Sequence, residues 1–402
     1  MKTWAYLSSV LIFYFTYGLY ISQFDDKVNQ SGFSLSTPNN FYDYKGVINV
    51  HTNRSLGSSP AEVILRAATQ ADLDFIIFTD LNDLEGSDNY DYYYGRTLVL
   101  SGTKINYLDA RFIHYSPRER VLGSNLAAAQ LRLADLLSSD AWVNRDKLLI
   151  LVHPFMEGFE WKGDIPPGVD GIEQINIKAL ALLKWSEDRI SSIWSVLTYP
   201  FNSQLAFIRL FTEPSREITL VDEESQRRPF WAFSGAEASA RAIPFSNSVI
   251  KFPSYQKHFE MFSNHVLLDS ELTGSLEKDR QKIFSALKNG AFYIAFDAIG
   301  EATGFEAWVD CSGQIFPIGS QIKLRDDCKL ISRLPGELKF FFEQVVYKNA
   351  VRHFTTNSAY FELPLKEPGA YRIQVRVSPY LPLPDAKKWI TWIYTNHFRI
   401  SL

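Results

Sequence analysis

The segments GVINVHTNRSLG, residues 46–57, and FIIFTDLND, residues 75–83, decide the fold prediction for this chain. Each begins with an apolar run of strand character and ends in polar residues, His51 in the first and Asp80 in the second. Between them, AEVILRAATQA carries apolar residues at helical spacing. A strand, a helix and a second strand in this order form a βαβ unit, and such units build parallel sheets.

The helix between these two strands has a clear start signal. Ser59 is the predicted N-cap, Pro60 occupies the first helical position, and Glu62 lies two residues further on. Proline is tolerated at a helix start because the backbone N–H that it lacks would have no partner there. We therefore predict a helix that begins with Ser59 as its cap.

Strands that end in a polar residue recur as far as about residue 265. The predicted strands cover 47–51, 75–80, 97–101, 148–153, 171–176 and 231–237, and helical stretches at 125–138 and 178–193 separate several of them. In a (β/α) barrel the carboxyl ends of the strands converge on one face, where barrel enzymes place their chemistry. We predict a barrel of this kind.

The opening segments resemble those of the PHP superfamily, the polymerase and histidinol phosphatase domain. That family opens with His-x-His-Thr and Ser-Asp-Gly, and continues after a helix with Thr-Asp-His-Asn. The corresponding residues here are Asn49, His51, Thr52, Ser55, Leu56, Gly57, Thr79, Asp80, Leu81 and Asn82. The resemblance implies a distorted (β/α)7 TIM-like barrel and an ancestry among metal-dependent phosphoesterases, which hold two or three metal ions at strand ends.

Several family ligand positions have changed. Asn49, Leu56 and Leu81 stand where the family has ligands, and Ser239 stands where it has a last histidine. In SGTKI, residues 101–105, Lys104 stands where the resemblance implies a bridging carboxylate. A lysine there would repel a cation, so we expect the metal centre to be degenerate.

The resemblance leaves three potential metal ligands, His51, His153 and Glu237, with Glu173 and Asn176 at the end of a neighbouring strand. Two imidazoles and one carboxylate can hold at most one divalent metal ion, Zn, Mn or Fe, but not a cluster. The alternative is that both histidines are leftover strand-end residues bonded to their neighbours. We further hypothesise that Lys104 pairs with Glu173 or Glu237 in place of the lost metal, and that Asp80 caps a turn rather than acting as acid or base.

Composition excludes some classes of function. The chain has 402 residues, of which 46% are hydrophobic and 15% aromatic, so well-filled cores are expected. Its 41 basic and 45 acidic residues give a formal charge of −4 and no basic stripe. We therefore expect no nucleic acid partner.

The N-terminus contains an uncharged run from Thr3 to Gln23 after a single lysine. This length suits a bilayer core, so residues 1–24 are predicted to form a transmembrane signal anchor, followed by a polar tether over 25–43. A cleaved signal peptide and a buried soluble helix are the alternatives. Either form of export places the folded part outside the cytoplasm, in the periplasm or the extracellular space.

The pattern of apolar and polar residues changes near residue 301. After a predicted helix at 277–289, alternating runs broken by Gly, Pro and Asn indicate an antiparallel β-sandwich over 301–402, behind a barrel over 44–300. This part is similar to the appendage on exported PHP-like proteins. Cys311 and Cys328 are the two cysteines of the chain, and they form either a disulfide or two unlinked thiols.

The sequence thus predicts a membrane-anchored PHP-like protein that binds or scaffolds rather than hydrolyses. One alternative is an active single-metal phosphoesterase acting on a phosphorylated small molecule. Another is an envelope- or carbohydrate-binding protein that recognises its partner through the C-terminal β-domain.

Overall fold

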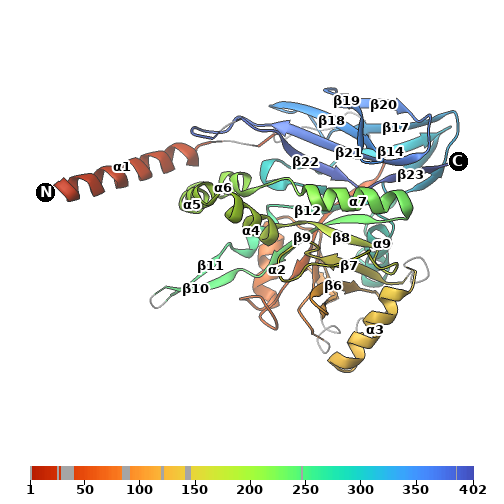
Figure 1. Ribbon diagram of the computed structural model, residues 1–402, viewed down its shortest axis with the longest axis horizontal. Helices are drawn as coiled ribbons and strands as arrows, with labels where there is room; N and C mark the ends of the chain where they lie inside the picture. Colours follow the sequence, from red (N-terminus) through yellow and green to blue (C-terminus); the bar gives the residue numbers. More distant parts are fainter. Residues whose placement is uncertain are drawn as a thin grey trace.

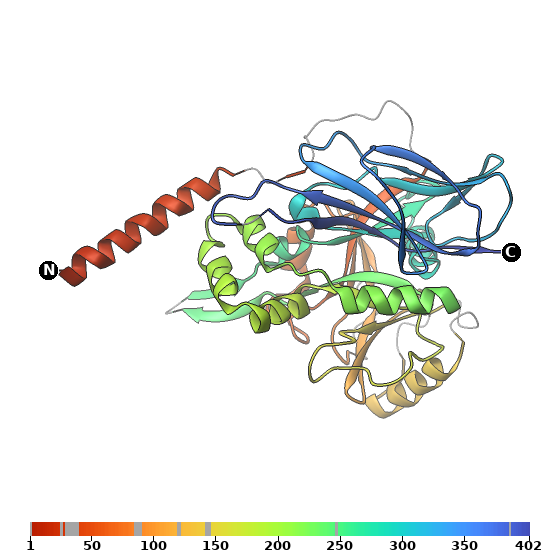
Figure 2. The same ribbon diagram turned by 45° about the horizontal axis from the view of Figure 1, so that its top comes forward.

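The structure, a computed structural model, describes residues 2–24, 27–28, 40–83, 91–118, 122–140, 146–245, 248–385 and 387–402. A closed barrel with flanking helices lies beneath the layered β-sheets of the C-terminal part, and helix α1 extends away from both (Figure 1). The same arrangement is seen after rotation (Figure 2).

The barrel closes through a ring of strands. Its strands are β1 (Tyr42–Val50), β2 (Phe75–Phe78), β4 (Thr97–Ser101), β5 (Thr103–Tyr107), β6 (Ala110–Tyr115), β7 (Leu148–Val152), β8 (Gly171–Asn176) and β9 (Trp231–Ala238). Strand β5 directly follows β4 and connects to the segment after β2 through the bridge between Leu81 and Lys104. Strand β9 pairs with β1 and completes the ring. Apolar side chains, including Ile48, Ile77, Ile113, Ile150 and Phe233, fill its interior. They form an apolar layer beneath the carboxyl ends of the strands.

Three antiparallel pairings depart from a purely parallel barrel. Strands β1, β2 and β4 run parallel, as do β7, β8 and β9, but β6 is antiparallel to both β5 and β7. The first half of β1 also pairs antiparallel with β12 (Ser263–Leu268), from Tyr42 to Gly46. The barrel is therefore distorted. Strand β1 pairs with β12 in its first half and with β2 and β9 in its second half.

The predicted helices form, one with a different cap and one divided in two, and α6, α7 and α8 are additional helices that were not predicted. After α1 the helices are α2 (Ala61–Gln70), α3 (Leu126–Ser138), α4 (Ile177–Glu187), α5 (Arg189–Thr198), α6 (Ser203–Leu210), α7 (Ser215–Arg227), α8 (Tyr255–Phe259) and α9 (Leu276–Lys288). The N-cap of α2 is Pro60 and not Ser59, and it makes no side-chain cap bond. The predicted helix 178–193 is divided at Asp188, because its carboxylate accepts the Ser191 N–H and starts α5.

The C-terminal part consists of β-strands with antiparallel pairing, apart from the parallel pair β16–β23. One sheet has the order β15 (Gln314–Pro317), β14 (Glu306–Cys311), β17 (Cys328–Arg333), β20 (Tyr360–Pro364). The other strands are β16 (Gln321–Lys323), β18 (Phe341–Lys348), β19 (Val351–Thr356), β21 (Gly369–Ser378), β22 (Ile390–Thr395) and β23 (Phe398–Ser401). A disulfide joins Cys311 to Cys328 on adjacent strands.

The two parts of the chain share a sheet. Strand β13 (Phe292–Ala295) pairs with β12 on one side and with β22 on the other. Strand hydrogen bonds therefore run from the barrel strand β1 through β12 and β13 into the C-terminal sheets. The predicted division at residue 300 stays a prediction. The predicted tether 25–43 lies mostly outside the described residues, and its last two residues belong to β1.

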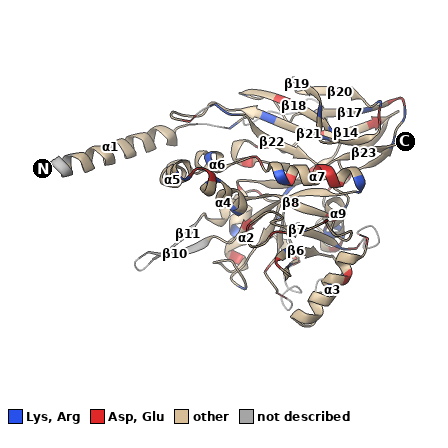
Figure 3. Cartoon of the chain, in the orientation of Figure 1, with Lys and Arg blue, Asp and Glu red and all other residues tan. Residues whose placement is uncertain are grey.

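Helix α1 (Lys2–Ser22) forms where the anchor was predicted. After Lys2 the helix contains no Lys, Arg, Asp or Glu, and Figure 3 shows this part of it in tan. The prediction of a transmembrane helix is nevertheless not supported, since among the residues described no helix is long and apolar enough to cross a bilayer. Tyrosines and serines, such as Ser8, Ser9 and Tyr14, dilute the apolar run.

Candidate functional site

A buried group of polar side chains gathers where the barrel strands end. This strand-end cluster consists of Asn49 and His51 at the end of β1, Lys104 on β5, His153 after β7, Glu173 and Asn176 on β8, and Glu237 on β9. All are buried. Because parallel strands end on the same edge of a barrel, residues separated by up to 188 positions in the chain are brought into contact.

Lys104 lies at the centre of this cluster. Its Nζ donates to Glu237 Oε2 at 2.6 Å and to Asn49 Oδ1 at 3.1 Å, and lies 3.5 Å from His51 Nε2. The lysine is fully buried, and the side chain of Glu237 is 3% exposed. A side-chain ammonium thus lies among the buried carboxylates and imidazoles of the cluster.

The amide of Asn49 links the two carboxylates of the cluster. Its Nδ2 donates to Glu173 Oε1 at 2.5 Å and to Glu237 Oε2 at 2.7 Å. The second oxygen of Glu173 accepts a hydrogen bond from Nδ2 of Asn176 at 2.7 Å. The side-chain oxygen Oδ1 of Asn176 accepts the Ala179 N–H and so caps α4. Neutral amides therefore satisfy carboxylates where a metal-dependent site would use imidazoles and ions.

His153 lies between the two carboxylates. Its Nδ1 is 3.5 Å from Glu173 Oε2, and its Nε2 is 3.4 Å from Glu237 Oε2. Among the described residues, neither ring nitrogen has a partner with hydrogen-bond geometry, and Nδ1 of His51 has none either. Buried polar atoms without partners are rare and call for an explanation at each site.

Three residues of the cluster have a left-handed backbone. The φ angles are 62° at Asn49, 54° at His153 and 45° at Glu237. Residues other than glycine rarely adopt this left-handed backbone conformation, which costs about 1–3 kcal/mol each. Strain of this kind concentrates at functional sites, so these three residues mark the cluster as a candidate functional site.

Burial and neighbouring charges shift the pKa values of several side chains in the cluster. Burial opposes ionisation of Glu237, yet Lys104 and the two imidazoles hold the pKa of this carboxyl well below its usual range. Burial raises the pKa of Glu173, against the lowering effect of His153 and Lys104. Burial also lowers the pKa of His51. At neutral pH the cluster therefore contains an ionised Glu237 beside Lys104, and a neutral His51.

The residues do not fit a metal cluster. Ligand atoms of His153, Glu173 and Glu237 lie within 4.8 Å of one another, so donors for one ion are present. However, the Glu237 oxygen that they would share already accepts the ammonium of Lys104 at 2.6 Å. An ion bound there would face a buried like charge, which is costly in a low-dielectric site.

The remaining predicted site residues lie outside the cluster or support its edge. Asp80 accepts hydrogen bonds from Thr52 N, Thr52 Oγ1 and Ser55 Oγ, and so orders the loop after β1. Leu81 forms an isolated bridge to the backbone of Lys104. The expectation that Leu56 lies in the pocket is wrong, because its side chain is 44% exposed. Ser239 contributes only its carbonyl oxygen, to Tyr255 and Ser58.

Two supporting residues were missed in the sequence. The Tyr255 hydroxyl donates to the His51 carbonyl oxygen at 3.0 Å and so fixes the turn after β1. Gly235 leaves room for Glu173, since a Cβ there would lie 1.5 Å from Glu173 Oε1. The glycine of FSGAEA was a visible signal, because a glycine inside a strand often marks the close approach of another group.

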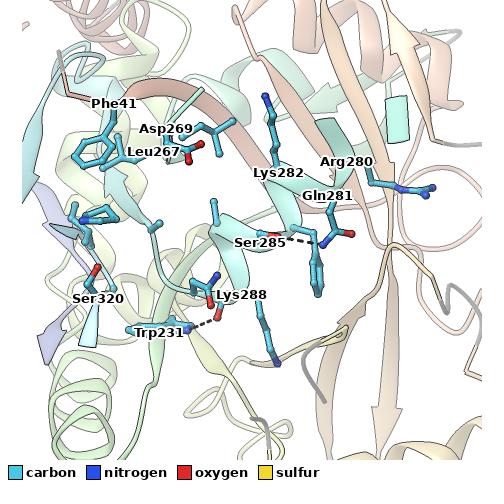
Figure 4. A pocket seen from close by; sticks show the side chains of 18 of the residues that line it. Phe41, Trp231, Leu267, Asp269, Arg280, Gln281, Lys282, Ser285, Lys288 and Ser320 are labelled. Carbon is cyan, nitrogen blue, oxygen red and sulfur yellow. Dashed lines mark hydrogen bonds between the residues drawn. The ribbon is translucent and has the colours of Figure 1, made fainter. Parts of the chain in front are cut away.

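A separate groove of about 1510 Å³ lies on another face. It is lined by α9, including Lys282, Ser285 and Lys288, and by residues of the C-terminal part such as Ser320 (Figure 4). Its described lining includes no member of the strand-end cluster. The groove contains a buried ion pair, Asp170 with Lys288, in which burial raises the pKa of Asp170 to about 6 against the lowering effect of Lys288. The strand-end cluster brings together two carboxylates, two imidazoles and an ammonium, and we therefore take it as the candidate site.

Comparisons with known proteins found a likeness among solved structures. The scan against protein-family models found no match, and the search of curated proteins found no similar protein. A crystal structure from Bacteroides vulgatus is similar, described as a two-domain protein containing a predicted PHP-like metal-dependent phosphoesterase. The identity is 12% and the TM-score 0.36, over 90% of this chain and 99% of that chain.

Proposed function

We propose that this chain is a PHP-like protein whose metal centre has been replaced by an internal ion pair, and that it binds or scaffolds rather than hydrolyses phosphate esters. The observation that carries the proposal is the 2.6 Å contact between Lys104 Nζ and Glu237 Oε2 at the strand ends. A lysine ammonium provides positive charge at a fixed point but cannot activate water as a metal ion does.

The surrounding contacts support this replacement. Asn49 donates to both carboxylates, a role that needs an uncharged amide and no metal. Its carbonyl oxygen accepts Lys104 Nζ, so the same side chain also stabilises the cation. The retained left-handed backbone at Asn49, His153 and Glu237 is consistent with a centre inherited from a catalytic ancestor.

The test is to measure bound metal and phosphatase activity on the same samples. The chain is incubated with Mn²⁺ or Zn²⁺ and assayed with p-nitrophenyl phosphate, alongside His51→Ala and His153→Ala variants. We expect the same background rate from all three proteins. A metal-dependent rate that both substitutions abolish would contradict the proposal.

A single-metal phosphoesterase is the second candidate, and His153 favours it. Both ring nitrogens are buried without hydrogen-bond partners among the described residues, and each faces a carboxylate at 3.4–3.5 Å. Such a group could bind one ion if Lys104 moved away from Glu237. Lys104→Ala separates the two candidates, because gain of metal binding in this variant alone shows that the lysine excludes the ion.

Three further expectations stay proposals. The first is recognition of a phosphorylated small molecule or an envelope component, and the second is recognition through the C-terminal β-domain. The third is attachment to a membrane through α1, with the folded part outside the cytoplasm. The many large apolar side chains exposed on α1, among them Trp4, Ile12 and Phe13, support some form of attachment. Partition of the full chain into liposome pellets would test it.

A further inference from the structure

A second buried group of ionisable side chains lies at the other end of β1. This junction cluster consists of Asp43 and Lys45 on β1, His265 on β12, Asp297 in the 3-10 helix η2 (Asp297–Ile299) and Glu301 just beyond it. Asp43 and Asn49 are six residues apart on one strand, about 20 Å at the usual rise of a strand. The junction cluster is therefore separate from the strand-end cluster.

Asp43 fixes the orientation of the His265 ring. One oxygen of Asp43 contacts His265 Nδ1 at 2.9 Å, and the other accepts the Tyr293 hydroxyl at 2.6 Å and the Gly304 N–H at 2.9 Å. Tyr293 also stacks on the imidazole, with the ring centroids 4.7 Å apart. A carboxylate behind one ring nitrogen is the usual support of a histidine that binds a metal through its other nitrogen.

The other nitrogen of His265 faces an unsatisfied carboxylate. Nε2 lies 3.7 Å from Asp297 Oδ1, which is too long for a hydrogen bond. Among the described residues, His265 Nε2 and both oxygens of Asp297 have no hydrogen-bond partner, although these side chains are 0% and 4% exposed. Two ligands of one tetrahedral Zn²⁺ lie about 3.4 Å apart, close to the observed separation.

Glu301 completes a set of three donors. Ligand atoms of His265, Asp297 and Glu301 all lie within 4.8 Å of one another. Glu301 is 54% exposed, so an ion could enter from solvent and keep a water ligand. Imidazole nitrogen and carboxylate oxygen are both zinc ligands, so these three side chains and one water can form a tetrahedral set.

The charge of the junction cluster also leaves a place for a divalent cation. Asp43, Asp297 and Glu301 are acidic, and Lys45 is the cation among them. Its Nζ remains 3.5 Å from Asp297 Oδ2 and 3.4 Å from Glu301 Oε2, whereas Lys104 lies 2.6 Å from its partner. The three carboxylates outnumber the two basic side chains, Lys45 and His265. Burial lowers the pKa of His265, but Asp43 and Asp297 raise it to about 10, so zinc bound at Nε2 would displace a proton from the ring.

We propose that His265, Asp297 and Glu301 form a zinc site that joins the barrel to the C-terminal sheets. Asp297 and Glu301 belong to the segment between β13 and β14, which connects the two parts, while His265 belongs to a strand paired with β1. An ion held by all three would fasten this connecting segment to the end of the barrel. The site does not depend on the function proposed for the strand-end cluster.

Zinc titration of the full chain tests the proposal. After treatment with a chelator, Zn²⁺ binding is measured by calorimetry, zinc content by elemental analysis and the thermal midpoint with and without the ion. We expect one equivalent of zinc, a higher midpoint with zinc, and no comparable effect of Mg²⁺.

Three variants locate the ion. His265→Gln should abolish binding, and Glu301→Gln should weaken it at least tenfold. The metal-free midpoint of Glu301→Gln serves as its own baseline, because Glu301 also accepts hydrogen bonds from Lys45 and Thr303. His153→Gln is the matched control in the strand-end cluster and should bind one equivalent as the parent does. Absence of zinc binding by the parent, unchanged affinity in Glu301→Gln, or loss of zinc in His153→Gln would each overturn the proposal.

Discussion

Lys104→Met is the substitution that most sharply probes the internal ion pair. Methionine preserves most of the lysine volume and removes its charge, so Glu237 stays buried with no cation beside it. The Asn49 amide still donates to that carboxylate, but it supplies no charge. We expect a large loss of stability at neutral pH and a smaller loss in acid.

The contact distance sets the size of the effect. Two unit charges 2.6 Å apart attract by about 6 kcal/mol at an effective dielectric constant of about 20. The variant can avoid part of this loss by protonating Glu237. With an ordinary pKa of 4.5, protonation at pH 7 costs about 3.4 kcal/mol, since one pKa unit is worth about 1.36 kcal/mol. We therefore expect the free energy of unfolding to fall by about 3–4 kcal/mol at pH 7.

The pH dependence follows from the direction of the shift. In the parent, the depressed pKa of Glu237 gives stability that is present above pH 4.5 and lost as the pH falls through the folded-state pKa. In the variant, the cost of protonating Glu237 decreases by about 1.4 kcal/mol per pH unit. The difference between the two proteins should shrink by about 2.7 kcal/mol from pH 7 to pH 5.

Urea unfolding of both proteins at pH 7 and pH 5 measures these values. Glu237→Gln added to Lys104→Met should recover much of the stability, because it removes the unpaired charge. Lys329→Met is the control, since Lys329 pairs with Glu362 at an exposed site where little change is expected. A loss below about 1 kcal/mol at pH 7, or an equal loss at both pH values, would refute the reasoning.

Three further substitutions test other parts of the structure by urea unfolding at pH 7. Gly235→Ala forces Glu173 aside and should cost about 1–3 kcal/mol, and unchanged stability would mean that this carboxylate is not held as described. Asp222→Asn leaves a buried arginine of β21 without its charged partner and should cost about 3–5 kcal/mol. Replacing Cys311 and Cys328 by serine opens a crosslink across 17 residues and should cost about 3 kcal/mol; reduction of the parent should have the same effect.

Local sequence pattern predicted the barrel strands β1, β2, β4, β7, β8 and β9, but not β5 and β6. Strands at 97–101 and 171–176 form with the predicted bounds, and the others differ by a few residues at their ends. Continuous apolar runs bounded by polar residues are a strong local signal of buried strands. The antiparallel direction of β6 could not be read in this way, because strand pairing depends on contacts distant in sequence.

The candidate site was predictable only where a motif marked it. The resemblance of short strand-end motifs predicted that Lys104, His153 and Glu237 lie in one site. In the structure, both Lys104 and His153 contact Glu237. The junction cluster was missed because His265 and Asp43 meet only through the antiparallel register of β1 and β12. No spacing in the sequence reveals a diagonal pair of this kind.

Crystals of the full chain soaked in Mn²⁺ provide the most direct test of the central claim, with anomalous scattering used to locate every ion. We predict that no manganese binds at the strand ends and that Lys104 Nζ stays in contact with Glu237. Two manganese ions bound by His51, His153 and Glu237, with Lys104 displaced, would contradict it.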